Sequence, residues 1–195
     1  FCIGPGFLYY VAMEQTGDCE LAAANVVKSI SMLFFVLVNS VDKTTFSLVG
    51  NRRWVKQTEK IMPTCRLVML LDYVIGIPLI LLAFLFSNSF LRLFTNDMEV
   101  VHTAFYPFCV MLSTFIISVP AYTYCNTVIG TGNTKIAFIF QLINITVYLC
   151  YLFILSRSPG IPLAMYWTAE QLYVIVLLVL SLVYLKGNRW KNKSL

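Results

Sequence analysis

The stretch 61–87, IMPTCRLVMLLDYVIGIPLILLAFLFS, decides the fold. An α-helix needs about 20 consecutive apolar residues to cross the hydrocarbon core of a bilayer, and this stretch exceeds that length while carrying only Arg66 and Asp72 as charged groups. Hydrophobic types make up 59% of the 195 residues and charged types 12%, which is about half the charge of an ordinary soluble domain. Stretch and composition together predict a membrane-embedded helical protein.

Apolar stretches of similar length flank this one on both sides, at 21–50, 98–130, 135–156 and 161–186. Turn-forming segments such as Gly130-Thr131-Gly132-Asn133 separate them. Strands of a membrane β-barrel would instead be about 10 residues of alternating polarity. We therefore expect an all-α polytopic membrane protein with five full transmembrane helices. Because the connecting loops are too short to hold a folded domain, its function should lie among the helices.

The chain opens with an apolar stretch, 1–13, that is too short to span a bilayer and has no basic segment before it, so it does not resemble a signal peptide. We expect residues 1–13 to be the end of a truncated transmembrane helix. Residues 14–186 would then form the five-helix lobe, and residues 187–195 a basic tail.

The basic residues predict the orientation of the helices, because cytoplasmic loops carry an excess of Lys and Arg. Only Arg92 and Arg157 fall on one side of the predicted membrane. Most of the others fall on the opposite side: Arg52, Arg53, Lys56, Lys60, Arg66, Lys135, Lys186, Arg189, Lys191 and Lys193. We therefore expect a multi-pass protein of the cell (inner) membrane with a cytoplasmic C-terminus. This bias accounts for the net charge of +5 without a nucleic-acid partner.

Ionisable residues within the spans are candidate functional groups, because a charge in hydrocarbon costs about 3 kcal/mol or more. At about 1.5 Å per residue, Asp72 and Glu170 lie near the bilayer midplane, and Asp42 lies closer to the inner surface. Burial favours the protonated form of a carboxyl group, so such a group can exchange a proton for a cation. The alternative is a carboxyl group that is hydrogen-bonded to a neighbouring helix and only locks the packing.

Two lysines also lie inside the first predicted span. Lys43 is about 6 Å nearer the cytoplasm than Asp72 by depth, so we hypothesise a Lys43–Asp72 ion pair, with extension of the side chain to the inner surface as the alternative. We expect Lys28 to extend toward the outer surface. His102 is the only histidine, so we expect no metal site, no cofactor other than a coupling ion, and no enzyme activity.

Uncharged polar and aromatic residues concentrate in the third and fourth spans, where Pro107 and Pro120 interrupt the helical hydrogen bonding. These side chains would suit a pocket for flat aromatic cations, although the same residues also pack helices or face lipid. The candidates for lining a substrate cavity are Asn39, Met111, Phe115, Tyr122, Tyr124, Gln141 and Asn144.

Several short segments resemble the multidrug and toxic compound extrusion transporters. The segment 21–30, LAAANVVKSI, resembles the start of the eighth helix of that family, and SLVGN at 47–51 resembles its end. LFTND at 93–97 resembles the loop before the tenth helix, and NTVIGTGNTK at 126–135 resembles the link to the eleventh. The chain departs from the family in Arg52-Arg53-Trp54 after Gly50, and in Asp42-Lys43 where small residues are usual.

The resemblance implies most of one lobe of a twelve-helix, two-lobe transporter that works by alternating access. It implies export of a cationic or drug-like small molecule in exchange for protons or sodium, with the missing N-terminal lobe and the lipid bilayer as partners. The family's coupling carboxylates have no counterpart here, since residues 100–130 contain no acid. A proton site in this lobe would have to be Asp72, Glu170 or Asp42. The alternative function is a flippase for lipids or lipid-linked oligosaccharides.

Overall fold

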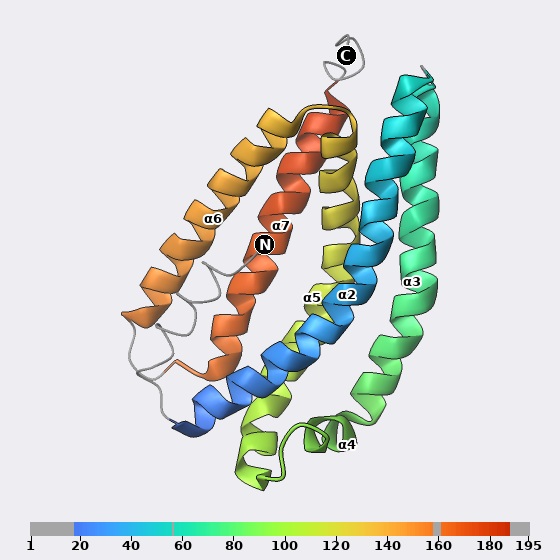
Figure 1. Ribbon diagram of the computed structural model, residues 1–195. Helices are drawn as coiled ribbons and strands as arrows, with labels where there is room; N and C mark the ends of the chain where they lie inside the picture. Colours follow the sequence, from blue (N-terminus) through green and yellow to red (C-terminus); the bar gives the residue numbers. More distant parts are fainter. Residues whose placement is uncertain (1–17, 56, 158–160, 188–195) are drawn as a thin grey trace.

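The computed structural model describes residues 18–55, 57–157 and 161–187, without the side chains of residues 37, 38 and 42. The expected stump at 1–13 and nearly all of the expected tail at 187–195 lie outside this range. The described residues form helices joined by short loops. In chain order the helices are α2 (Asp18–Trp54), η1 (Thr58–Lys60), α3 (Ile61–Leu85), α4 (Ser87–Arg92), α5 (Met98–Gly130), α6 (Thr134–Ser156) and α7 (Leu163–Lys186) (Figure 1).

The described residues contain five helices long and apolar enough to cross a membrane, namely α2, the continuous run of η1 and α3, α5, α6 and α7. Each coincides with one predicted apolar stretch, so the prediction of an all-α polytopic membrane protein is confirmed. Helix α2 extends beyond the predicted stretch at both ends. Asp18 and Glu20 lie in its first turn and Arg52 and Arg53 in its last, where they complement the helix dipole.

Helix α5 lies at the centre of the bundle and contacts every other long helix (Figure 1). Half of its most apolar window is buried within the chain, compared with 17% for α3. Helices α2 and α3 pack on one side of α5, while α6 and α7 lie on the other.

The ends of α5 are set by local side-chain and backbone chemistry. Asp97 precedes the first turn and its side chain accepts a hydrogen bond from the backbone N–H of Glu99 at 2.9 Å, which is the usual role of an N-cap. At the other end Gly132 has φ = 82°, a conformation that glycine adopts without steric cost. The Gly-Thr-Gly-Asn segment therefore turns the chain directly from α5 into α6.

Proline residues lie inside two of the long helices: Pro78 in α3, and Pro107 and Pro120 in α5. A proline lacks the N–H that would bond the carbonyl four residues earlier, so Pro120 leaves the carbonyl of Ile116 without its helical donor. The hydroxyl of Tyr73 on α3 donates to this carbonyl at 2.8 Å. The break in α5 thus becomes a hydrogen bond between α5 and α3.

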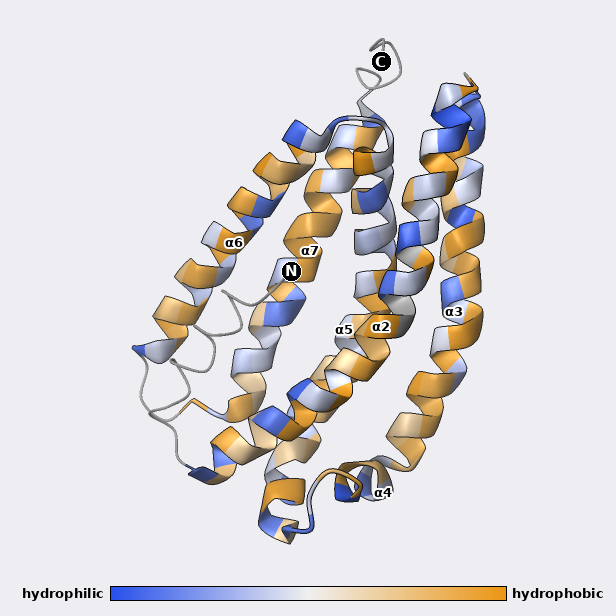
Figure 2. Cartoon of the chain, viewed as in Figure 1, coloured by the Kyte–Doolittle hydropathy of each residue, from blue (hydrophilic) through white to orange (hydrophobic). Residues whose placement is uncertain are grey.

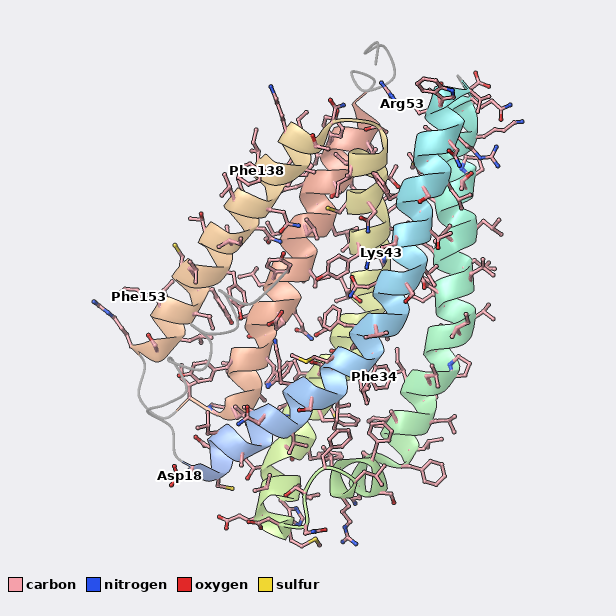
Figure 3. The ribbon with its side chains drawn as sticks, viewed as in Figure 1. Asp18, Phe34, Lys43, Arg53, Phe138 and Phe153 are labelled. Carbon is pink, nitrogen blue, oxygen red and sulfur yellow. The ribbon has the colours of Figure 1, made fainter. Side chains whose placement is uncertain are left out.

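Large apolar side chains are exposed on all the long helices, and most of all on α3. Figure 2 shows hydrophobic residues along α3 and α6, and many of them are exposed, such as Leu85 (72%) and Val74 (62%) on α3. Phe138 and Phe153 extend from α6 away from the bundle (Figure 3). Such surfaces are unfavourable in water and suit contact with lipid or with other transmembrane helices.

The closest approach of α2 and α5 depends on a glycine. A Cβ atom added at Gly130 would lie 3.0 Å from the carbonyl oxygen of Phe46 and 3.0 Å from the Val49 side chain. At Gly50, across the same contact, the nearest atom would be 4.0 Å away. Gly130 therefore sets the distance between the two helices, as small residues commonly do between membrane helices.

Candidate functional site

Asp72 lies in the middle of α3 and is the most deeply buried acidic side chain of the described residues, with 6% of its surface exposed. One of its carboxylate oxygens, Oδ2, has no hydrogen-bond partner among them. A buried carboxyl oxygen without a donor is costly in a membrane, where water does not reach it readily. Asp72 is thus buried inside the bundle, and no hydroxyl group of the described residues donates to its Oδ2.

Asp72 faces a cavity between α2, α3 and α5, which we call the Asp72 cavity. Its volume is about 660 Å³ including its open mouth. Its lining is apolar and aromatic apart from Asp72 and a few polar atoms, and it consists of Phe34, Ser40, Val41, Asp72, Tyr73, Ile75, Gly76, Ile77, Leu79, Ile80, Phe115, Ile116 and Val119.

A second cavity continues from the first along the seam between α2 and α3. It has a volume of about 860 Å³ including its mouth, and it shares Phe34 and Leu79 with the Asp72 cavity. The rest of its lining is wholly apolar: Leu33, Leu82, Ala83, Phe86 and Phe90. We call the two together the α2–α3 groove, which has an apolar end near α4 and a carboxylate at its deep end.

Lys28 on α2 and Glu170 on α7 form the only ion pair found among the described residues, with 3.4 Å between Lys28 Nζ and Glu170 Oε1. The hydroxyl of Tyr148 on α6 donates to the same oxygen at 3.4 Å. The lysine ammonium also lies 5.7 Å from the centre of the Trp167 ring, within range of a cation–π interaction. This cluster joins α2 to the consecutive helices α6 and α7 at the other end of the described chain.

The ion pair borders a third, much smaller cavity between α2, α5 and α7, with a volume of only about 10 Å³ apart from its open mouth. Ser31, Thr114 and Ser118 also line it. Each of these hydroxyls donates to a backbone carbonyl of its own helix, so its oxygen keeps lone pairs that can accept. The ion pair thus has hydroxyl groups beside it, while the rest of the lining, Phe35, Met111, Phe115 and Trp167, is apolar or aromatic.

Two sequence-based expectations for the lysines differ from the structure. The prediction that Lys28 extends to the outer surface is wrong, because its ammonium group turns inward to Glu170 and only 18% of its side chain is exposed. The structure also does not bring Lys43 and Asp72 together. Lys43 is exposed midway along α2 (Figure 3), and no ion pair links it to the buried Asp72 within the described chain.

Depth along the bilayer normal explains why the Lys43–Asp72 hypothesis failed. It fixes only one coordinate of a side chain, and two residues at similar depth still need helix faces that meet. The side chain of Asp42, the third candidate carboxylate, lies outside the described part of the structure.

The candidate cavity-lining residues fall into two groups. Met111 and Phe115 line the cavity around the ion pair, and Phe115 also lines the Asp72 cavity, where its ring packs 5.1 Å from that of Phe34. Tyr122 packs edge-on against Phe35 and Tyr124 packs in a separate core cluster.

The remaining candidates make contacts outside these cavities. Asn39 donates to the Phe35 carbonyl on its own helix at 2.7 Å, and Gln141 accepts from the hydroxyl of Tyr173 at 2.7 Å. Asn144 is fully buried, and neither amide atom has a hydrogen-bond partner among the described residues. Only two of the seven candidates thus lie in the three cavities described here.

The described residues contain no group of three or more His, Cys, Asp or Glu side chains that could hold a metal ion. Four residues that line these cavities were not predicted as site residues: Lys28, Phe34, Gly76 and Trp167. A signal for one of them was present: Lys28 and Glu170 lie at similar distances, ~10 and ~14 Å, from the outer ends of their spans. The same depth argument that suggested Lys43–Asp72 would have suggested Lys28–Glu170.

Long apolar helices with charged side chains turned into the bundle define the class of the molecule: it is a multi-pass α-helical membrane protein. A family model for MatE matches residues 6–154. The chain therefore belongs to the MatE family of transporters, which confirms the resemblance to multidrug and toxic compound extrusion proteins. Comparisons with curated proteins and with solved structures gave no match.

Proposed function

We propose that this chain is part of a secondary active exporter that expels cationic or drug-like small molecules in exchange for protons or sodium. The observation that carries the proposal is the buried Asp72 carboxyl, which lacks a partner at Oδ2 and faces a cavity inside a membrane-spanning bundle. A carboxyl group in this position binds a proton or a cation, but not both. Such exclusive binding is the elementary requirement of exchange.

The second intramembrane carboxyl has a different role in this proposal. Lys28 already supplies a positive charge to Glu170, and Tyr148 donates a hydrogen bond to the same oxygen. Glu170 would bind a proton or sodium only when Lys28 moves away, so it acts as a coupling group only if the α2–α7 contact opens during transport. Asp42 remains a third candidate. Of the two whose side chains are described, Asp72 is the carboxyl that faces a cavity with a buried oxygen lacking a donor, which supports it as the first choice.

The ion pair also favours an exporter of cations over a flippase. A lipid pyrophosphate would need free basic groups in the cavity. Lys28 is paired with a carboxylate, and Lys43 does not line any of the three cavities described above. The carboxylate at the end of the α2–α3 groove attracts cations and repels anionic lipid headgroups.

The test is efflux of a fluorescent organic cation from vesicles that contain the protein, driven by an imposed proton or sodium gradient. Asp72→Asn should lower the initial rate by about tenfold or more, because the amide cannot bind a proton or carry a charge. Asp97→Asn is the matched control: it is the same substitution at an exposed N-cap, and Asn also caps helices well. Full activity in both Asp72→Asn and Glu170→Gln would exclude both carboxyls from coupling.

A further inference from the structure

We propose that the α2–α3 groove is a binding site for an amphiphilic monocation, with the cationic head on Asp72 and the apolar body along the seam between the two helices. The inference rests on the proposed exchange at Asp72 and adds to it the place, the shape and the chemistry of the bound molecule. Figure 3 shows Phe34, which borders both parts of the groove, on the α2 side of this seam.

The negative charge of Asp72 favours a cation as the bound molecule. The Asp72 carboxylate is 6% exposed and its Oδ2 has no partner, so a positive group entering the cavity would find an acceptor that nothing else occupies among the described residues. The nearest hydroxyl on the same helix does not fill this position, because Tyr73 donates to the carbonyl of Ile116. A buried carboxylate without a counter-charge is unfavourable, and a bound monocation would supply that charge.

The walls of the groove suit an organic cation better than a bare metal ion. A metal ion that leaves water must replace its hydration shell with several protein oxygens. Besides Asp72, the side chains lining the Asp72 cavity offer only the hydroxyls of Ser40 and Tyr73, and the continuing cavity offers none. Apolar and aromatic walls instead match a ligand whose charge is carried by an organic group.

The shape of the α2–α3 groove favours an elongated ligand. The two cavities share Phe34 and Leu79. Without their open mouths they have volumes of about 140 and 450 Å³, so the apolar cavity by itself reaches the roughly 300–1,000 Å³ of small-molecule sites and the Asp72 cavity would hold only the charged head. Asp72, Gly76 and Leu79 lie on one face of α3. This face therefore carries the carboxylate, a glycine without a side chain and the start of the apolar cavity, one after the other. A ligand with one charged end and an apolar body fits this arrangement.

Gly76 makes the proposal testable without removing the charge. A Cβ atom added at Gly76 would meet no heavy atom within 4 Å, so a larger side chain there enters the cavity instead of the protein packing. Gly76→Leu is therefore a variant that blocks the groove and should still fold. Val74→Leu is the matched control, because Val74 lies on the same helix, is 62% exposed and does not line the groove.

The experiment measures equilibrium binding of labelled tetraphenylphosphonium to the purified protein in nanodiscs, with no ion gradient. We expect saturable binding to the wild type and to Val74→Leu. Asp72→Asn and Gly76→Leu should each weaken it about tenfold or more. Asp72→Glu, which keeps the charge, should retain most of the affinity. Tetraphenylborate, which has the same shape and the opposite charge, should not compete.

Three results would overturn the inference: no saturable binding to the wild type, unchanged binding in both Asp72→Asn and Gly76→Leu, or equal competition by tetraphenylborate. Equal competition by tetraphenylborate would mean that the groove is only an apolar surface that contacts lipid or another helix. If Asp72→Asn does not fold, Gly76→Leu and Asp72→Glu still decide the question. Because binding needs no gradient, failure of transport with intact binding would disprove the proposed function and leave this site standing.

Discussion

Lys28 and Glu170 are 142 positions apart in the sequence and lie 3.4 Å apart in the structure, joining α2 to α7 across the face of the central helix α5. The pair is partly buried, with 18% and 23% of the two side chains exposed. Each charge therefore depends on the other, because neither is fully solvated. This contact links the two sides of the bundle beside the small cavity that Lys28 and Glu170 line.

Removing one member of this pair should destabilise the protein more than removing both. Lys28→Met or Glu170→Gln alone leaves a charge without its partner, and we expect a loss of roughly 2 kcal/mol, between the values for exposed and fully buried pairs. The double variant should recover part of this loss. Thermal unfolding in detergent measures it, with exposed Lys43→Met as the control. Equal melting temperatures for single and double variants would contradict a mutual dependence.

The hydrogen bond from Tyr73 to Ile116 should contribute to the packing of α3 on α5. Tyr73→Phe removes the donor that replaces the one lost at Pro120, so the carbonyl of Ile116 is left unsatisfied. We expect a loss of about 1 kcal/mol, the usual size for hydrogen bonds between membrane helices. Tyr106→Phe removes a hydroxyl from a side chain that is 72% exposed and should change nothing. A matching loss in both variants would show that the effect is not specific to this bond.

The close contact of α2 and α5 should tolerate a methyl group at one glycine and not at the other. Gly130→Ala places a Cβ 3.0 Å from the backbone oxygen of Phe46, so the helices must move apart, and we expect a loss of about 1–3 kcal/mol. Gly50→Ala has 4.0 Å to its nearest atom and should be neutral or slightly stabilising, since alanine favours helix. Melting temperatures of the two variants in the same detergent give the comparison, and the reverse order would refute the predicted geometry.

The buried amide of Asn144 should reduce stability. It is fully buried with no hydrogen-bond partner for either amide atom in the described chain, so Asn144→Leu should raise the free energy of unfolding by about 1–2 kcal/mol. Gln141→Leu, three residues earlier on the same helix, removes the acceptor of Tyr173 and should lower the free energy of unfolding. Efflux measured on Asn144→Leu adds a second readout. A stabilised but inactive variant would indicate that Asn144 is retained for transport.

Much of the architecture followed from the sequence. The apolar stretches at 61–87, 98–130 and 135–156 match α3, α5 and α6 closely, because helix length in a membrane is dictated by bilayer thickness and turn residues separate the spans. The depth of Asp72 was also predictable, since the rise per residue of a helix is constant. The structure shows that Asp72 is buried in the bundle, while its depth in a bilayer stays a prediction.

The partners of the intramembrane charges were not predictable in the same way. Lys43 and Asp72 are close in depth but do not pair, whereas Lys28 and Glu170 meet although they come from the first and last described spans. Periodicity indicates which residues share a face of one helix. It does not indicate which helix that face meets, or how the helices are rotated about their axes.

The amino-acid sequence therefore determined that this protein is built from long apolar helices of membrane-spanning length, and about where each helix begins and ends. Those properties depend on local hydrophobicity and on distance along one helix. The tertiary structure alone decided that Lys28 neutralises Glu170, that Tyr73 satisfies the carbonyl freed by Pro120, and that Asp72 faces an open groove. Each of these depends on the rotation and close packing of neighbouring helices, which arise from contacts between residues distant in the chain.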